Sequence, residues 1–562
     1  MFLHLKNQRL LLFSILALAF LVRIVGIQFG LPNLYHADEP IIVNHAMAYG
    51  TGDFNPHFFK IPPLVSYLLF VVYTFYFLIG KGLGCFSTVD NFADLFLANS
   101  TSFYLIARIL FGTVIGTFTV YFLYRLAKKY FSSIQALISS FFLAFCFLHV
   151  RDSHYIYTDI TLVLILVLCF FPIFQVLEKA SRRAYVLFGI LAGVAVATKY
   201  NGVIIFVPFI LAHCLKNRFK LRSLINFNLF LSASSSFLVY SLLNPFGWLD
   251  FRFFLDELLR QGKAEAASGF LHHFTYSLNG ALGFPLLALS SIGCFIAMFQ
   301  YDQKKWTLLS FMFIYYVILC FKSQPYDRYV LPLIPFLLLF AAEGLIWIKE
   351  KFNLSNALFF IFSFVVAAPP IVKISLSDYL FIQKDIRTVS REWIERSIPS
   401  DTKIALDASV YMPRLKPSLN QLIQKRQAIA AARSTMQLKR IDLLIKQAKQ
   451  DKSAHYDLFF LSETSPNGKF LFSKPSISYD LNRLKESGVE YVVTSWANEK
   501  DKDQFFKDLA SQTTLIAKFT PYRDQMRELP IDNLALTGGP FLWDELIARE
   551  TNGQIIKVYR LK

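Results

Sequence analysis

Repeated apolar runs, each close to 20 residues long, constrain the fold of this 562-residue chain more than any other feature. A transmembrane helix needs about 20 apolar residues to cross the hydrocarbon core of a bilayer. The runs fall at 10–30, 62–80, 103–124, 134–150, 160–178, 184–198, 202–215, 225–244, 279–300, 306–321, 329–348 and 355–374. Only 17% of the residues are charged, which is low for a soluble protein. The sequence therefore predicts an α-helical multi-pass membrane protein.

The basic residues lie mainly in short clusters between these runs. The formal net charge is +18, and clusters such as RLAKK, EKASRR and KNRFKLR follow the pattern of cytoplasmic loops. In a nucleic-acid-binding protein they would form a patch on a soluble domain, so nucleic acid is not predicted as a partner, whereas the lipid bilayer is. The six cysteines show no CxxC spacing, which argues against a disulfide framework or a zinc site.

The run at 62–80 decides the predicted topology. Lys6 and Arg9 precede the first run and indicate an uncleaved anchor with a cytoplasmic N-terminus. If 62–80 crossed the membrane, the later basic clusters would fall outside, whereas five of them fall inside if it does not. We therefore predict about 11 spanning helices. The run 62–80 becomes an interfacial or re-entrant helix inside one long external loop, 31–102.

The sequence changes character after about residue 375, where charge rises and the long apolar runs stop. Five segments are predicted to be strands, namely TKIALDAS, YDLFFLS, VEYVVTSW, TLIAKFT and GQIIKVYRL. Four segments between them are helical in pattern, namely IRTVSREWIERSI, LKRIDLLIKQAKQ, YDLNRLKES and DQFFKDLAS. We predict a transmembrane domain at 1–374 and an extracytoplasmic α/β domain at 375–562. The α/β domain has no P-loop or GxGxxG motif.

Charged residues from several segments are predicted to meet at the external face. Charges at membrane depth are costly and usually face a cavity or a partner. The residues concerned are Asp38, Glu39, Lys60, Asp159, Lys199 and Arg328, with Arg108 inside an apolar run. Acids and bases that converge from separate segments predict a functional site.

In this order the motifs resemble the lipid-carrier-dependent glycosyltransferases of the GT-C type, which include protein O-mannosyltransferases and the lipid A aminoarabinose transferase. The motifs are NLYHADEP, KIPPL, YLIARILFG, RDSHYIYTDITLVLIL, VAVATKYNG and YDRYVLPLIP, within about residues 10–350. The resemblance implies a polyprenyl-phosphate sugar as the donor and a protein, lipid or glycan as the acceptor. It also implies an active site at the external, periplasmic face of a bacterial inner membrane.

The resemblance assigns the chemistry to carboxylates. Transfer to a hydroxyl or amine needs a carboxylate that accepts the acceptor's proton. The resemblance gives this role to Asp38, with Glu39 orienting it or sharing the acceptor. Asp159 would be a second carboxylate near the acceptor or the sugar. The structural alternative is a helix N-cap, at Asp38 before IIVNHAMAY and at Asp159 before TLVLILVL.

Cations are expected to hold the leaving phosphate, because cleavage of the sugar–phosphate bond leaves negative charge there. Arg108, Lys199 and Arg328 are candidates by position, and snorkelling to the interface is their structural alternative. Lys60 matches a lysine or histidine of the family, although the intervening Ile61 departs from the commoner spacing.

Three further residues complete the predicted substrate-binding set, namely Arg151, His154 and Tyr329. A hydrogen-bonded structural role is the alternative for His154. Arg23 is either a phosphate contact or a tie between helices. The adjacent His272 and His273 point apart and lack an acidic partner at ligand spacing, so a divalent metal is possible but is not indicated.

The predicted function is an inverting glycosyltransferase with an oxocarbenium-like transition state, by analogy with glycoside hydrolysis. A transporter or flippase of a lipid-linked or anionic substrate is the competing class, since intramembrane charges also mark substrate paths. Such proteins often show two related halves, whereas the acids here cluster in the first third of the chain. A third possibility gives the activity to the external domain and leaves the membrane part as an anchor. So many helices exceed what an anchor needs.

Overall fold

The computed structural model describes residues 5–261, 269–322, 326–406, 411–431, 435–451, 453–461, 479–495, 503–527 and 539–561. The chain forms two compact units. The first comprises Met1–Ile27, Ile41–Thr74 and Leu105–Asp378, and the second comprises Gln28–Pro40, Phe75–Tyr104 and Tyr379–Lys562. Two stretches of the predicted external loop 31–102 therefore belong to the same unit as the C-terminal part of the chain.

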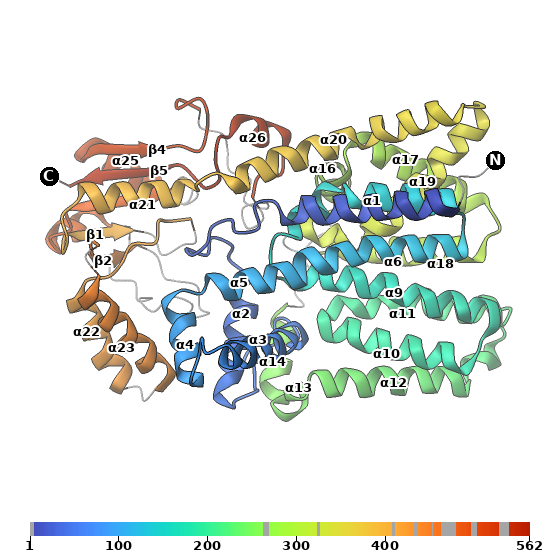
Figure 1. The fold of residues 1–562 in the computed structure, drawn as a ribbon, viewed down its shortest axis with the longest axis horizontal. Helices are drawn as coiled ribbons and strands as arrows, with labels where there is room; N and C mark the ends of the chain where they lie inside the picture. Colours follow the sequence, from blue (N-terminus) through green and yellow to red (C-terminus); the bar gives the residue numbers. More distant parts are fainter. Residues whose placement is uncertain are drawn as a thin grey trace. The chain divides into compact units, whose positions relative to one another are not determined.

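Helices dominate the chain up to residue 382 (Figure 1). The α-helices are α1 (Leu5–Ile24), α2 (Glu39–Ala48), α3 (Leu64–Gly82), α4 (Val89–Ala98), α5 (Thr101–Ala107), α6 (Ile115–Tyr130), α7 (Ser133–Ala144), α8 (Phe147–Asp152), α9 (Thr158–Lys179), α10 (Arg182–Thr198), α11 (Phe206–Lys216), α12 (Phe227–Leu243), α13 (Phe246–Leu249), α14 (Phe251–Gln261), α15 (Gly269–His272), α16 (Asn279–Leu282), α17 (Phe284–Phe299), α18 (Gln303–Cys320), α19 (Ile334–Lys351) and α20 (Asn356–Ile382). Short 3-10 or π segments are η1 (Tyr49–Thr51), η2 (Arg108–Val114), η3 (Tyr200–Ile205), η4 (Leu221–Leu224), η5 (His273–Leu278) and η6 (Asp327–Leu333). In the first unit, α1, α6, α9, α10 and α12 run roughly side by side.

Helices α10 and α12 approach closely through two glycines. Gly189 and Gly193 form a GxxxG spacing on α10. A Cβ atom at Gly193 would lie 2.7 Å from the backbone oxygen of Ser236, and one at Gly189 would lie closer still to the oxygen of Ser232. Small residues at this spacing let transmembrane helices pack backbone to backbone, so the sequence explains this pairing directly.

Six helical segments among the described residues are long and apolar enough to cross a membrane. The pair Gly269–Leu282 and Phe284–Phe299, bent by 114°, adds a seventh if it forms one broken span. These segments confirm the predicted multi-pass helical fold. The number of crossings stays a prediction, because helices such as α10, with 17 residues, are shorter than the usual span. Helix α3 has the length and composition of a span, so its predicted interfacial position also stays a prediction.

The C-terminal part folds into a five-stranded sheet with the order β2-β1-β3-β5-β4. The strands are β1 (Lys403–Leu406), β2 (Asp457–Phe460), β3 (Tyr491–Ser495), β4 (Thr514–Phe519) and β5 (Ile556–Arg560). The helices are α21 (Ile386–Ser397), α22 (Leu419–Ala431), α23 (Thr435–Gln450), α24 (Leu481–Glu486), α25 (Asp503–Gln512) and α26 (Trp543–Ala548). Strand β1 pairs in parallel with β2 and β3, whereas β5 runs antiparallel to β3 and β4. All five predicted strands and all four predicted helices are confirmed.

Both faces of this sheet are buried, and successive residues of a strand belong to the cores on opposite faces. In β1, Ile404 and Leu406 join the core beneath α21, while Ala405 joins the core beneath α24 and α25. Side chains point to opposite faces at successive strand positions, so a sheet covered on both sides needs apolar residues throughout. Helix α21 thus covers one face, and its Ile386 and Ile394 are buried in that core.

Candidate functional site

Five predicted site residues lie together in the first unit, in what we call the Asp159 cluster. These residues are Arg151, Asp159, Lys199, Arg328 and Tyr329, and contacts through Tyr157 and Asp327 link them. They come from the end of α8, the first turn of α9, the residue after α10 and the start of η6. Segments up to 178 residues apart in sequence therefore build one charged cluster.

The centre of this cluster is the ion pair between Asp159 and Lys199. Lys199 Nζ lies 2.6 Å from Asp159 Oδ1, while the buried Oδ2 atom of the same carboxylate has no hydrogen-bond partner. Asp159 is 4% exposed and is the second residue of α9, whose N-cap is Tyr157. The N-cap alternative for Asp159 is therefore wrong. A buried carboxylate oxygen without a hydrogen-bond donor costs stability.

Tyrosine rings hold two cations of the cluster. Lys199 Nζ lies 5.7 Å from the ring centroid of Tyr157 and 5.4 Å from that of Tyr329. The Arg328 guanidinium carbon lies 4.8 Å from the Tyr157 centroid and 5.3 Å from that of Tyr326. Cation–π attraction stabilises each cation, but two like charges on one ring still repel.

Arg151 is engaged by two carboxylates that the sequence interpretation missed. Its guanidinium lies 3.0 Å from Asp152 and 2.8 Å from Asp327, and it is 2% exposed. The backbone NH of Arg328 also donates to Asp327 Oδ1 at 2.6 Å. Each acid directly neighbours a predicted cation in the sequence, and this adjacency could have identified both acids as candidates. These two carboxylates match the charge of Arg151.

Arg23 forms a second buried group, the Arg23 cluster, with partners of another kind. Its guanidinium donates to the carbonyl oxygens of Ala19, Ala144 and Leu143 at 2.8, 3.1 and 3.2 Å. It also lies 3.0 Å from His149 Nδ1. These contacts join α1 to the chain at the end of α7 and in α8. They favour the helix-tie interpretation of Arg23 over a phosphate contact.

Arg108 and His154 are held by the segment that follows α1. Arg108 is fully buried at the start of η2 and donates from Nη1 to the Ile27 oxygen at 2.7 Å. His154 is also buried, with Nε2 2.8 Å from the Val25 oxygen and Nδ1 3.0 Å from the Val150 oxygen. Carbonyl contacts of this kind match the hydrogen-bonded structural alternative for His154.

Lys60 is exposed and lies in the chain before α3. The adjacent Phe59 fixes this stretch, because its NH donates to the carboxylate of Glu257 and its oxygen accepts from the Tyr200 hydroxyl at 2.9 Å. The backbone at Lys60 is thus anchored to α14 and η3, while its side chain stays in solvent.

Asp38 and Glu39 belong to the second unit, whereas the Asp159 cluster belongs to the first. Asp38 is half-buried directly before α2, and its backbone NH donates to His36 Nδ1 at 3.3 Å. Glu39 is fully buried at the first position of α2. Acids at a helix N-terminus are favoured by the helix dipole, which explains why the sequence tolerates a paired acid there.

Among the described residues, no group of three or more His, Cys, Asp or Glu side chains could hold a metal ion. His272 and His273 stand nearly perpendicular, at 79°, and His273 Nδ1 lies 3.0 Å from the Ser277 hydroxyl. In the Asp159 cluster, carboxylates are paired with Arg151 and Lys199.

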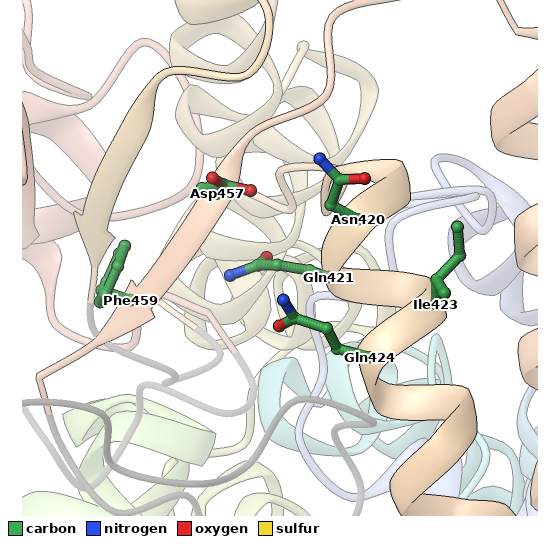
Figure 2. A pocket seen from close by; sticks show the side chains of 6 residues that line it. All are labelled: Asn420, Gln421, Ile423, Gln424, Asp457 and Phe459. Carbon is green, nitrogen blue, oxygen red and sulfur yellow. The ribbon is translucent and has the colours of Figure 1, made fainter.

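The C-terminal domain contains a polar pocket of about 380 Å³ (Figure 2). Its lining residues are Asn420, Gln421, Ile423, Gln424, Asp457 and Phe459. The Gln421 amide is committed to the edge strand β2, where it accepts from the Leu458 NH at 2.9 Å and donates to the Leu458 oxygen at 3.0 Å. None of the predicted site residues lines this pocket.

Comparison with known proteins places the fold. The family model described as dolichyl-phosphate-mannose-protein mannosyltransferase matches residues 87–243. No curated protein sequence matches the chain.

Solved structures extend the likeness over most of the chain. The Archaeoglobus fulgidus oligosaccharyltransferase in its apo form matches with a TM-score of 0.50 at 12% identity, covering 93% of this chain and 75% of that chain. The same enzyme tethered to an acceptor peptide gives 0.50 at 12%, covering 90% and 71%. Apo ArnT from Cupriavidus metallidurans gives 0.48 at 12%, covering 98% and 97%. The chain has the fold of GT-C type glycosyltransferases, as its motifs predicted.

Proposed function

We propose that this chain is an inverting glycosyltransferase that moves a sugar from a polyprenyl-phosphate carrier to an acceptor at the external membrane face. The GT-C fold and the family match at 87–243 support a lipid-carried donor. The observation that carries the proposal is the Asp159 cluster, where two cations share the Tyr157 ring beside a carboxylate with one unpartnered oxygen. No nucleotide-binding motif is needed for such a donor.

Lys199 and Arg328 bind the carrier phosphate in this proposal. When the bond between the anomeric carbon and the phosphate oxygen breaks, the electron pair stays on the phosphate. Fixed cations in a buried site stabilise that charge more strongly than they would in water. Tyr157 and Tyr329 keep Lys199 in place, and Arg151 fixes η6 through Asp327.

Asp38 is the general base. It accepts the proton of the acceptor hydroxyl or amine while the acceptor's oxygen or nitrogen bonds to the anomeric carbon. Attack opposite the phosphate inverts the anomeric centre and releases polyprenyl phosphate. Glu39 orients Asp38 from the first turn of α2.

Asp159 takes a hydrogen bond from the substrate. Its Oδ1 atom is paired with Lys199, while Oδ2 accepts from a sugar or acceptor hydroxyl. Such a bond supplies the missing donor and ties the substrate to the cation that holds the phosphate. Arg108 and Lys60 complete the substrate-binding set, with Lys60 contributing from its exposed position, while His154 keeps the structural role that its carbonyl contacts indicate.

The proposed topology follows from the positive-inside pattern. The N-terminus is cytoplasmic and the C-terminal α/β domain is extracytoplasmic. The membrane is the plasma membrane, which is the inner membrane of a bacterium. The acceptor is a protein, a lipid or a glycan that reaches this face.

Replacement of the base tests the proposal. Membranes with wild-type protein or Asp38→Asn are incubated with labelled polyprenyl-phosphate sugars and a cell extract as acceptor. We expect release of the free carrier by wild type and a loss of about 10²–10⁴-fold in the variant, the usual contribution of a general base. Asp53→Asn is the matched control, an exposed acid in the same predicted loop that pairs with His57 at 3.0 Å. Equal release by wild type and Asp38→Asn would remove Asp38 as the base.

A transporter is the second candidate, and one observation favours it. The helices ending at Leu282 and starting at Phe284 meet at 114°, and broken helices often line transport sites. If folded protein releases carrier from no donor although the acceptor pool is competent, transport of a lipid-linked or anionic substrate becomes the better interpretation.

A further inference from the structure

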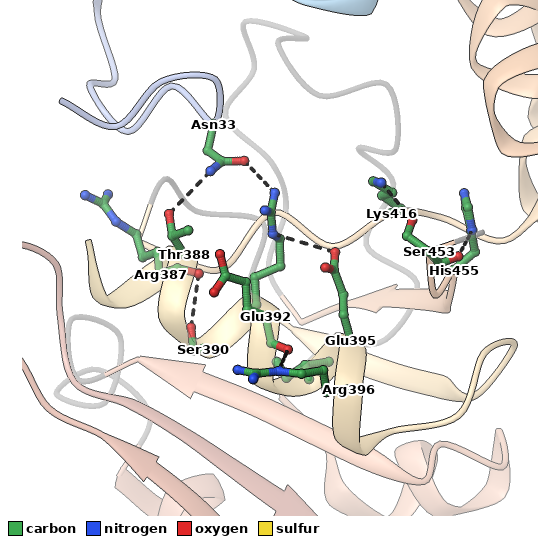
Figure 3. A network of polar contacts seen from close by, with 12 residues as sticks. Asn33, Arg387, Thr388, Ser390, Glu392, Glu395, Arg396, Lys416, Ser453 and His455 are labelled. Atoms are coloured by element: carbon green, nitrogen blue, oxygen red, sulfur yellow. Dashed lines mark hydrogen bonds and ion pairs between the residues drawn. The ribbon is translucent and has the colours of Figure 1, made fainter. Parts of the chain in front are cut away.

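The segment Gln28–Pro40, which carries Asp38, packs within the second unit against helix α21 of the C-terminal domain. Figure 3 shows Asn33 between two side chains of α21. Its amide nitrogen donates to the Thr388 hydroxyl at 3.3 Å, and its amide oxygen accepts from Arg391 Nη1 at 2.8 Å. Both the nitrogen and the oxygen of the Asn33 amide thus form hydrogen bonds with helix α21.

Tyr35 makes a second set of contacts with the same helix. Its hydroxyl lies 2.7 Å from Thr388 Oγ1, so Thr388 joins two residues of the segment. The Arg387 guanidinium lies 3.8 Å from the Tyr35 ring centroid and donates to the Tyr35 carbonyl at 3.4 Å. Burial raises the pKa of Tyr35 to about 12, so its hydroxyl stays protonated well into the alkaline range.

The platform that receives these contacts is itself fixed. Arg387 is held by a bidentate pair with Asp385, at 2.8 Å to Oδ1 and 2.7 Å to Oδ2. The Ile386 NH donates to the Asn552 oxygen at 2.9 Å, just before β5. Ile386 and Ile394 are buried against the sheet. Helix α21 therefore presents a rigid face to the segment.

We propose that α21 is a positioning element for the general base, with Thr388, Arg387 and Arg391 holding Asn33 and Tyr35 so that Asp38 is presented in one place. The inference rests on the proposed function of Asp38. It gives the C-terminal domain a role in the transfer step beyond any role in acceptor recognition. In this proposal Thr388, Arg387 and Arg391 act on Asp38 through their contacts with Asn33 and Tyr35.

The distance along the chain makes this control effective. Three peptide units separate Tyr35 from Asp38, a span of at most about 10 Å. A displacement of Tyr35 is therefore expected to displace Asp38 as well. Misplacing a catalytic group by about 1 Å can cost on the order of 100-fold in rate.

A double-mutant cycle on full-length protein in membranes tests the inference. Tyr35→Phe removes one hydroxyl and keeps the ring under Arg387, and Thr388→Val removes the hydroxyl that both Tyr35 and Asn33 use. We expect each variant to lower kcat by about 10-fold or more with the donor KM unchanged. The double variant should be no worse than Thr388→Val alone, because the two hydroxyls serve one contact. Thr388→Ser keeps the hydroxyl and should restore the wild-type rate.

A labelling experiment separates this inference from the proposed function. Ala37→Cys, next to the base, is made in a Cys85→Ser background because Cys85 is exposed. We expect a membrane-impermeant maleimide to label it several-fold faster when Tyr35→Phe and Thr388→Val are added. Asp451→Asn, elsewhere in the same domain, should leave the labelling rate unchanged.

The outcomes distinguish the two claims. If wild type and Asp38→Asn show the transferase pattern but the Tyr35 and Thr388 variants match wild type in kcat and labelling, the positioning role is wrong while the function stands. If wild type turns over no donor, the proposed function fails, and unchanged labelling would overturn the positioning role as well. Additive losses in the cycle would also contradict it.

Discussion

Two aspartate–lysine pairs in this molecule have the same length and different surroundings. Lys199 lies 2.6 Å from Asp159 in the membrane domain, and Lys416 lies 2.6 Å from Asp451 in the C-terminal domain. The first pair is 17% and 5% exposed, whereas the second is 42% and 35% exposed. Exposed pairs contribute at most about 1 kcal/mol to stability, while breaking a buried pair costs about 3–5 kcal/mol. Distance alone therefore does not rank them.

The two carboxylates also differ in the hydrogen bonds that they accept from other groups. Asp451 accepts from the NH and the hydroxyl of Ser453, both at 2.9 Å, so its carboxylate is fully engaged. Asp159 keeps a buried Oδ2 atom without a hydrogen bond. The two pairs therefore differ in burial and in how fully the carboxylate is hydrogen-bonded, and in the proposed function a substrate hydroxyl donates to Asp159 Oδ2.

Removing Lys199 should give the largest effect. In Lys199→Met, Asp159 is left as a buried, unpaired charge, and the phosphate loses one cation. We expect a thermal unfolding shift in detergent equivalent to about 3–5 kcal/mol and carrier release at least about 100-fold slower. Unfolding and carrier release are measured on the same purified protein.

The double variant Asp159→Asn, Lys199→Met separates the effect of the pair on stability from its effect on carrier release. It removes both charges, so most of the lost stability should return while carrier release stays low. Full recovery of turnover together with stability would show that the buried pair is only structural, and the contrast with the Lys416 pair would then be one of burial alone.

Arg23 should lose stability rather than turnover, because its Nη1 and Nη2 atoms are bonded to carbonyl oxygens and to His149, although its buried Nε atom has no hydrogen bond. Arg23→Gln removes hydrogen bonds to Ala144 and Leu143 that tie α1 to the end of α7. Bonds to a charged donor are worth about 1.5–3 kcal/mol each, so we expect a loss of about 2–4 kcal/mol in unfolding experiments. Carrier release per folded molecule should stay at the wild-type level. A specific loss of turnover would make Arg23 a phosphate contact after all.

Sequence patterns predicted most of the fold because they report local physics. Apolar runs predicted the multi-pass helical class, and short segments rich in β-branched, aromatic and other apolar residues predicted all five strands of the sheet. Charge position singled out Asp159, Lys199 and Arg328, which the structure joins through the Tyr157 ring.

Partner choice could not be predicted in the same way. Arg23 and Lys199 are both single cations in sequence, one within an apolar run and one directly after a run, but Arg23 contacts carbonyl oxygens and Lys199 contacts a carboxylate. Asp152 and Asp327 were missed because their role depends on Arg151, which contacts both only after folding. The link between Tyr35 and Thr388 spans 353 residues and carries no local pattern.

The exposed pair should give the smallest effect, and its pH dependence has a definite sign. The hydrogen bond from Lys416 holds the pKa of Asp451 well below its usual range, with the Ser453 NH adding to the shift. A depressed carboxyl pKa contributes stability above the unfolded value, about 3.9, and that contribution is lost as pH falls through the folded pKa. Asp451→Asn should therefore unfold slightly earlier than wild type at pH 7, with the gap closing below about pH 4 and shrinking in high salt. A gap at pH 7 as large as that of Lys199→Met would show that exposure does not separate the two pairs.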